Sequence, residues 1–248
     1  MNRAATRHLS AAAVAALLLL GAATLSAAPG DGVTGSRHDF SAHQPNGEIC
    51  IFCHTPHNAK TRTLLWNHTL SSSAFRWNVA RTTGGTDFAQ FSGDTYGGPT
   101  AKCLSCHDGT VAVGDYGYLT ASGQPPAWDY KIPSSSAYSV GPAGDLKGTH
   151  PVSMPYPFMN QASTYNGVTT GAHVALDEWL ADPTAAGIPL YTDFGTAPRQ
   201  AAPQVGRTGI ECTSCHDPHN QAVSDVYFLR GSLSSEDPDY ICAKCHEK

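Results

Sequence analysis

Eight cysteines fall in four pairs along this 248-residue chain, and each pair has the spacing C-x-x-C followed at once by a histidine. The four motifs read CIFCH, CLSCH, CTSCH and CAKCH, and they begin at residues 50, 103, 212 and 242. No cysteine lies outside them. Two thiols and an imidazole at this spacing can hold a porphyrin covalently and bind its iron, so the motif is the attachment signature of c-type haem.

Each residue of the motif has a separate predicted role. The two thiols bond to the vinyl groups at one edge of the porphyrin, and the histidine binds the iron as its proximal ligand. The sequence therefore predicts four covalent haem c groups. The predicted attachment residues are Cys50, Cys53, Cys103, Cys106, Cys212, Cys215, Cys242 and Cys245, and the predicted proximal ligands are His54, His107, His216 and His246.

Disulfide bonds and structural zinc are the alternatives for an even number of cysteines in an exported chain. A structural zinc site needs two C-x-x-C pairs to cooperate as four ligands around one ion. Neither alternative requires a histidine directly after every second cysteine. The pattern therefore favours haem.

Each haem iron has a second axial position, and the group that fills it decides the chemistry. A distal histidine gives a closed site suited to electron transfer, methionine raises the reduction potential, and an open position permits catalysis. The mature chain offers only two methionines, Met154 and Met159, which we expect to be packing residues. It offers seven further histidines, so we predict two histidine ligands on all four irons. These seven are His38, His43, His57, His68, His150, His173 and His219.

Two of these histidines occur in a repeated hexapeptide, CHTPHN at residues 53–58 and CHDPHN at residues 215–220. The histidine three residues earlier already holds an iron, and the porphyrin separates the two axial positions of that iron. His57 and His219 are therefore predicted to bind a different haem, with the proline stiffening the turn. The alternative is that they contact haem propionates or solvent.

His150 and His38 complete the predicted set of distal ligands. His150 lies in an extended segment before a proline, and His38 lies in a segment near the mature N-terminus that can reach a haem of the same chain or of a neighbouring subunit. The alternative for both is a polar loop residue. His43, His68 and His173 are predicted to be polar loop residues or propionate partners.

The N-terminal segment predicts export. Arg3 and Arg7 precede an apolar run with four consecutive leucines, and small residues follow, as is typical of a secretory signal peptide over residues 1–28. The alternative is an uncleaved membrane anchor, for which the apolar run is short. We expect residues 29–248 to form a single tetrahaem domain that is secreted to the cell surface or the extracellular space, with the periplasm as the alternative.

The composition predicts an unusual core. Charged residues make up 14% of the chain, which contains 24 glycines and 17 prolines. Removing Arg3 and Arg7 changes the formal charge from -5 to -7, which disfavours nucleic acid as a partner. Residues 84–99 and 117–148 show neither helical nor strand periodicity. We predict a mostly irregular, loop-rich fold with a few short helices, little sheet and a haem-filled core.

Two segments predict helices that would position these groups. Residues 171–181 contain AHVALDEWLA and end before Pro183. The C-terminal segment DPDYICAKCHEK offers Asp237 as a cap and Pro238 at the first helical position, directly before the fourth motif.

Several segments together resemble a known family: EICIFCHTPHN, LLWNHTLS, CLSCHDGTVA, THPVS and CTSCHDPHN…FLR…ICAKCH. They resemble exported multihaem c-type cytochromes of the doubled C-x-x-C-H type, and most closely the tetrahaem cytochromes that polymerise into extracellular nanowires. The resemblance covers most of the mature chain and is concentrated around the haem motifs. It implies stacked bis-histidine haems, with His57, His150 and His219 as distal ligands and His38 completing a haem of the next subunit.

Three functions compete at this point. The first is electron transfer as the subunit of a conductive homopolymer that delivers electrons to other redox proteins or extracellular acceptors. The second is a monomeric periplasmic shuttle or the electron-donating subunit of a reductase complex. The third is an enzyme with one open haem, which the surplus of histidines disfavours. We predict an electron-transfer protein without catalytic residues.

Overall fold

The computed structural model describes residues 27–44, 46–57, 59–61, 63–117, 127–195 and 198–247. The expected signal peptide lies outside the described residues except for Ala27 and Ala28. Within these ranges, no helix has the length and apolar character needed to cross a membrane.

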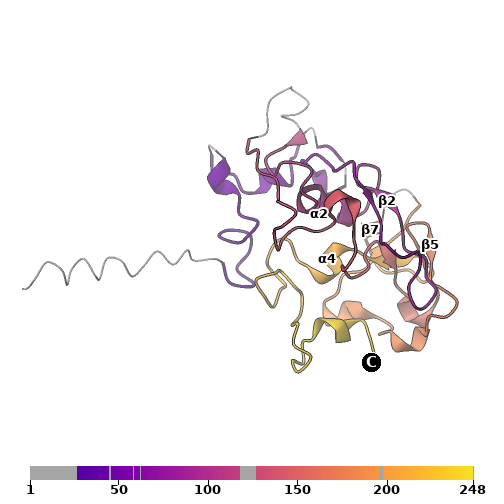
Figure 1. The fold of residues 1–248 in the computed structure, drawn as a ribbon. Helices are drawn as coiled ribbons and strands as arrows, with labels where there is room; N and C mark the ends of the chain where they lie inside the picture. Colours follow the sequence, from indigo (N-terminus) through magenta and orange to yellow (C-terminus); the bar gives the residue numbers. More distant parts are fainter. Residues whose placement is uncertain are drawn as a thin grey trace, which may run out of the picture.

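Short elements joined by turns make up the described chain (Figure 1). The longest described helix is α2, Pro99–His107, which begins with a proline and ends at the second motif's histidine. The third motif forms α4, Cys212–Cys215, which packs against α2. The other described helices are 3-10 helices: η1 (Ser41–His43), η2 (Cys50–Phe52), η3 (Thr63–Leu65), η4 (Pro142–Gly144), η5 (Phe158–Asn160), η6 (Leu176–Glu178), η7 (Pro183–Ala186) and η8 (Ile241–Lys244).

A small antiparallel sheet with the strand order β3-β8-β6-β7 lies next to the third motif. Its strands are β3 (Met154–Pro155), β6 (Tyr191–Thr192), β7 (Arg199–Gln200) and β8 (Thr208–Ile210). Met154 pairs with Ile210, and Tyr191 pairs with Gly209 and Gln200. Because β8 ends one residue before α4 begins, the sheet fixes the position of the third motif. Two separate hairpins pair β1 (Ala74–Phe75) with β2 (Phe91–Ser92) and β4 (Thr164–Tyr165) with β5 (Val168–Thr169).

The buried apolar residues form three small clusters rather than one continuous core, and each cluster includes part of a haem motif. Leu104 of CLSCH belongs to the first cluster, with Phe75 and Leu146. Cys245 of CAKCH packs against the second, and Phe52 of CIFCH belongs to the third. The motif residues between the cysteines therefore anchor the haem-attachment segments to the protein interior.

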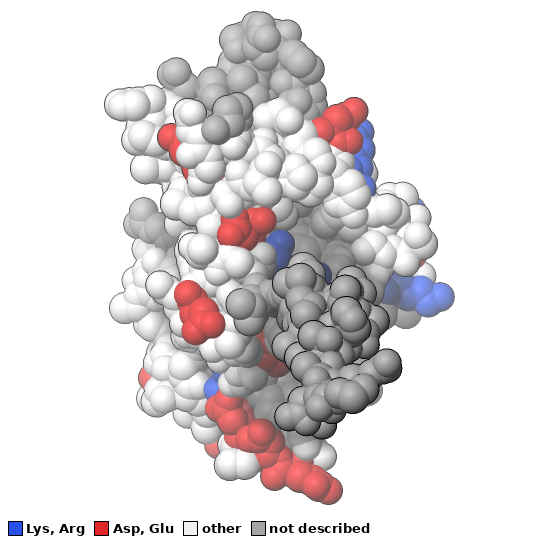
Figure 2. Space-filling model, turned by 90° about the vertical axis from the view of Figure 1, so that its left-hand side faces the viewer, with Lys and Arg blue, Asp and Glu red and all other residues white. Residues whose placement is uncertain are grey.

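Charged side chains are sparse on the surface. Figure 2 shows a face on which most atoms belong to uncharged residues, with Asp and Glu scattered over it and few Lys and Arg. This agrees with the low charged fraction of the sequence, 14%.

The helix predicted over residues 171–181 is wrong. Only the 3-10 helix η6 forms there, and tertiary contacts hold the flanking residues in extended conformations. The N–H of Gly171 donates to Thr86 Oγ1 at 2.8 Å, and Trp179 forms an isolated antiparallel bridge with His246. These non-local bonds replace the helical hydrogen bonds that the local pattern favoured.

The predicted start of the C-terminal helix is also wrong. Asp237 Oδ1 accepts from the N–H of Asp239 at 2.8 Å, which makes a local turn instead of a helix cap. The helical segment begins later and is limited to η8, Ile241–Lys244.

Candidate haem-binding sites

Three of the four motif histidines use the same ring nitrogen to bond a backbone carbonyl. Nδ1 of His54, His107 and His216 donates at 2.6, 2.7 and 2.8 Å. The acceptors are the carbonyl oxygens of Leu64, Tyr138 and Tyr227, respectively. This bond places the proton on Nδ1 and leaves Nε2 unprotonated, which is how proteins orient a histidine that binds a metal. The three rings are therefore prepared as iron ligands.

The fourth motif histidine, His246, is held by Trp179. Their rings lie 4.3 Å apart, and their backbones form the isolated bridge already described. Leu180 N–H also donates to the carbonyl of Cys245 at 3.0 Å. The extended segment at Trp179 and Leu180 thus pairs with the fourth motif. The histidines of the first and third motifs pair in the same way, with Trp66 and Leu229.

Within the described residues, three pairs of histidine rings are in contact, and each pair joins one motif histidine to one predicted distal histidine. The centroid distances are 6.2 Å for His54–His219, 6.2 Å for His38–His107 and 6.4 Å for His150–His246. Two imidazoles on opposite sides of one metal ion, with metal–nitrogen bonds of about 2.1 Å, have centroids about 6.4 Å apart. The three pairs fit the spacing that an iron between two rings requires.

His38 lies beside His107 of its own chain. Its Nδ1 lies 3.2 Å from the carbonyl oxygen of Pro218, and its ring lies 4.9 Å from that of Phe228. Burial lowers the pKa of His38 to about 4, so the imidazole is neutral at neutral pH, which is the form that binds a metal. The family resemblance implies that His38 completes a haem of the next subunit. Within one chain, His38 lies beside His107, and its role as a ligand stays a prediction.

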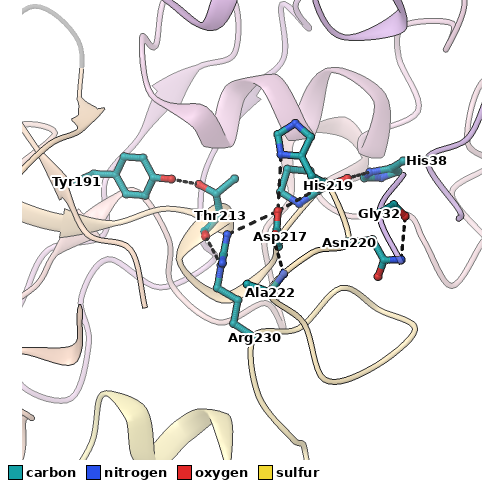
Figure 3. A network of polar contacts seen from close by, with 10 residues as sticks. Gly32, His38, Tyr191, Thr213, Asp217, His219, Asn220, Ala222 and Arg230 are labelled. Atoms are coloured by element: carbon teal, nitrogen blue, oxygen red, sulfur yellow. Dashed lines mark hydrogen bonds and ion pairs between the residues drawn. The ribbon is translucent and has the colours of Figure 1, made fainter. Parts of the chain in front are cut away.

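His219 is held by Asp217, its neighbour in the CHDPHN repeat (Figure 3). Asp217 Oδ1 accepts from the main-chain N–H of His219 at 3.1 Å and lies 3.7 Å from its Nδ1. The same carboxylate accepts from Ala222 N–H at 2.9 Å and faces Arg230 at 3.7 Å. Next to it, Asn220 donates to the carbonyl of Gly32 at 3.0 Å. The turn is therefore fixed on both sides.

His57 has no such arrangement. Its recorded hydrogen bonds are main-chain bonds with Thr55: the Thr55 hydroxyl donates to the His57 carbonyl at 2.8 Å and accepts from its N–H at 3.4 Å. Among the described residues, neither His57 nor His216 has another histidine ring in contact. The structure thus brings together three predicted ligand pairs, and the role of His57 stays a prediction.

The remaining histidines have other contacts. His68 is 1% exposed, and its ring nitrogens lie 2.7 Å from the Thr69 carbonyl and 2.8 Å from the Ala112 carbonyl. His43 stacks on Trp128 with centroids 3.6 Å apart. His173 is exposed. Their role as polar loop residues or propionate partners stays a prediction.

The two methionines differ from each other. Met154 is 3% exposed and belongs to the second cluster, as expected of a packing residue. The same expectation for Met159 is wrong, because Met159 is 51% exposed and its backbone has a φ of 57°. The left-handed conformation within η5 turns its side chain away from the interior.

Motifs that follow one another in the sequence are also neighbours in space at their cysteines. A hydrogen bond between Cys103 and Cys212 raises the pKa of the Cys212 thiol. Burial and then nearby Cys106 raise the pKa of Cys53 to about 12, and burial and then nearby Cys215 raise that of Cys245 to about 12. Each of these thiol pairs therefore joins two motifs that are consecutive in the sequence: the first and second, the second and third, and the third and fourth. None of the eight cysteines forms a disulfide bond. The described ranges contain no group of three or more His, Cys, Asp and Glu residues placed to hold a metal ion.

The hexapeptide repeat extends to a second segment that sequence reasoning missed. The Cys53 carbonyl accepts from Asn67 N–H at 2.9 Å, and the Cys215 carbonyl accepts from Arg230 N–H at 2.9 Å. Two residues after these cysteines, the bonds correspond again. Thr55 N–H donates to the Leu65 carbonyl at 2.9 Å, and Asp217 N–H donates to the Phe228 carbonyl at 2.8 Å. The backbone φ is 51° at Leu65 and 62° at Phe228. Backbone acceptors have no side-chain signature, so only their position 10 or 11 residues after the motif histidine could have indicated them.

Comparison with known families matches residues 204–248 to a family described as the doubled CXXCH motif (Paired_CXXCH_1). No curated protein matches the chain. The matched residues contain the third and fourth motifs and the segment that clamps His216. The match supports covalent binding of haem c and a role in electron transfer rather than in catalysis. Over residues 204–248, the chain carries the doubled CXXCH motif of multihaem c-type cytochromes.

Proposed function

We propose that this protein transfers electrons through four covalent c-type haems, each with two histidine ligands, as the subunit of an extracellular conductive filament. The observation that carries the electron-transfer role is the set of three histidine pairs at 6.2–6.4 Å, each with one motif histidine. An iron with two histidine ligands has no position left for a substrate, so such a site suits electron transfer.

The haem, when attached, supplies the iron that accepts and releases one electron. The protein's own residues do the rest. The cysteines fix the porphyrin edge, and the carbonyls of Leu64, Tyr138 and Tyr227 hold the proximal rings in the ligating tautomer. Hydrogen bonding and burial around the iron then set its potential.

The order of the cysteines supports a single electron path along the chain. The closest cysteines belong to consecutive motifs, so electrons passing between neighbouring haems would follow the sequence order. Cys50 of the first motif and Cys242 of the fourth are the exposed cysteines. The two ends of the path are therefore the places where a neighbouring redox centre can approach.

Among the described residues, His216 is the predicted proximal ligand that has no second histidine ring in contact, and this supports assembly into a filament. His216 is exposed, and so is the remaining predicted ligand, His57. We place His57 of one copy on the iron at His216 of the next, which gives a head-to-tail contact. Such a contact builds a filament when the rotation between copies does not close into a ring. This assigns the cross-subunit role to His57 instead of His38. The alternative is the monomeric periplasmic shuttle or donor subunit, in which His57 reaches His216 within one chain.

Replacing His57 tests the assembly. We expect the secreted wild-type protein to form filaments in electron micrographs, with only low-spin haem in the electron paramagnetic resonance spectrum. His57→Ala should give discrete single chains with one high-spin haem, while the matched exposed control His173→Ala should behave as wild type.

Two results would decide against this assignment. A wild-type protein that is a single chain by native mass, with four low-spin haems, supports the shuttle. Filaments of His57→Ala with only low-spin haem exclude His57 as the ligand between copies.

Export is part of the same proposal. We place the mature N-terminus at the end of residues 1–28, with delivery to the cell surface or extracellular space. Mass spectrometry of the protein from the culture medium should find the chain shortened by that segment and carrying four haems.

A further inference from the structure

A carboxyl group lies in the interior directly beside a haem cysteine. Glu211 is 0% exposed, and it separates the end of β8 from the first residue of α4, Cys212. Its side chain and that of Ser214 cap the helix reciprocally, and the N–H of Glu211 donates to Ser214 Oγ at 3.1 Å. Glu211 is therefore fixed relative to the attachment point of the third haem.

Neutral donors surround this carboxyl group. Oε1 accepts from the hydroxyl of Tyr96 and from that of Tyr165 at 2.5 Å. Oε2 accepts from Thr100 N–H at 3.0 Å and from Ser153 Oγ at 3.3 Å. Within the described ranges no lysine or arginine forms an ion pair with it. Four hydrogen bonds favour the carboxylate, but burial dominates and raises the pKa of Glu211.

The other titratable groups that face Glu211 are tyrosines, which stay neutral, and Lys102. Burial raises the pKa of Tyr96 and of Tyr165, so both stay protonated. Tyr191 behaves in the same way and bonds Thr213. Lys102 is 4% exposed and directs its Nζ to the carbonyls that precede α2. Burial lowers the pKa of Lys102, and Glu211 raises it. Cys103 and Cys212 become uncharged thioethers once haem is attached.

The charge of the neighbouring haem iron affects the same carboxyl group. Cys103 and Cys212 share a hydrogen bond next to Glu211, so two attachment points lie beside it. A positive charge nearby stabilises a carboxylate, and reduction of the iron removes one positive charge. Reduction therefore favours the protonated form of Glu211, and by reciprocity protonation favours reduction.

Tyr96 lies between this carboxyl group and a cavity. A cavity of about 770 Å³ has Tyr96 in its wall, between Thr95 and Gly97. Water that enters the cavity can give a proton to the Tyr96 oxygen, which passes its own proton to Glu211 through their hydrogen bond. A buried group that must exchange protons needs such a route.

We infer that Glu211 takes up one proton when the haem attached through Cys212 is reduced and releases it when that haem is oxidised. The electron would come from a neighbouring haem, and the proton would pass from water in the cavity to the Glu211 carboxylate by way of Tyr96. Oxidation reverses both transfers. This inference rests on the proposed haem at the third motif but not on filament assembly.

The test compares Glu211→Gln, which keeps the shape of the side chain but cannot titrate, with the exposed control Glu236→Gln. Potentials of the haem-loaded protein are measured spectroelectrochemically over a range of pH. For wild type and Glu236→Gln, one haem potential should fall as pH rises, by up to about 59 mV for each tenfold change in proton concentration. Glu211→Gln should lose this slope. Equal slopes in all three proteins would overturn the inference.

Infrared difference spectra give a readout that does not depend on electron transfer rates. Reduction should produce a protonated-carboxyl C=O band in wild type that Glu211→Gln lacks. If Glu211→Gln fails to fold, Tyr165→Phe replaces it. Losing one hydrogen bond to the carboxylate should raise the pKa of Glu211. The pH range in which the haem potential depends on pH should therefore move to higher pH. An unmoved region contradicts the inference.

Peptide mass spectrometry separates this test from that of the proposed function. A mature protein without haem at Cys212 overturns the proposed function and this inference together. Full haem loading with a pH slope that Glu211→Gln does not change overturns the inference alone.

Discussion

The two CHxPHN turns have nearly the same sequence and the same local hydrogen bonds, yet they differ in what they reach. In both, the motif histidine donates Nδ1 to a carbonyl of a clamping segment, Leu64 in one and Tyr227 in the other. Only the second turn brings its last histidine, His219, within 6.2 Å of another motif histidine, His54. The residues that the two hexapeptides share therefore determine the local turn but not which motif histidine the last histidine approaches.

The difference comes from contacts outside the repeat. In the second turn, Asp217 faces Arg230, and Asn220 donates to the carbonyls of Ala28 and Gly32 at 2.9 and 3.0 Å. The first turn has Thr55 in place of Asp217, and the Thr55 hydroxyl bonds only within the turn. Long-range hydrogen bonds thus decide which turn can present a distal ligand inside its own chain.

The largest effect is expected from removing the ligand that the second turn presents. In His219→Ala the haem at His54 should change from low to high spin even in a single unassembled chain, because the pair lies within one chain. Electron paramagnetic resonance and the visible absorption spectrum measure this change. An all-low-spin spectrum would mean that His54 has a different partner.

The next largest effect is expected from the segments that bond the two turns, which contain Leu65 and Phe228 and should contribute differently to the free energy of unfolding. Phe228 is 8% exposed and Leu65 is 49% exposed, although they occupy corresponding positions. Phe228→Ala removes a buried ring and should lower the free energy of unfolding by about 3–5 kcal/mol, whereas Leu65→Ala should change it by less than about 1 kcal/mol. Denaturant titration of the haem-loaded variants gives both values. Equal losses would show that the two clamps are energetically the same.

A smaller effect is expected at the tie between the second turn and the N-terminal segment. Asn220 is 1% exposed, and Asn220→Ala leaves the Ala28 and Gly32 carbonyls without their donor. The unfolding free energy should fall by about 1–3 kcal/mol. The adjacent exposed residue provides the control, Gln221→Ala, which should be neutral in the same titration.

Sequence reasoning reached the local chemistry of the site but not its long-range geometry. The C-x-x-C-H spacing is local, so the attachment residues and proximal histidines follow from it directly. The repeated hexapeptide indicates the same role for His57 and His219. It does not show the contacts of Asp217 with Arg230 and of Asn220 with Ala28 and Gly32, which form in the second turn. The helix expected at residues 171–181 failed for the same reason, because Trp179 pairs with His246.

The placement of His38 shows the same limit from the other direction. Its position near the mature N-terminus allows a haem of either chain, and the family resemblance implies one of the next subunit. The carbonyl of Pro218 and the ring of Phe228 hold it beside His107 instead. Neither partner could be paired with His38 from the sequence, since 180 residues separate His38 from Pro218.

The tie between Asn220 and Ala28 also constrains the order in which the molecule can mature. It joins residues 192 positions apart, and the pairs of His54 with His219 and His38 with His107 both depend on the same turn. A chain that emerges from its N-terminus exposes its first two motifs long before residues 217–220 exist to close them. His54 and His107 therefore gain their neighbouring histidine rings only after the third motif has been made.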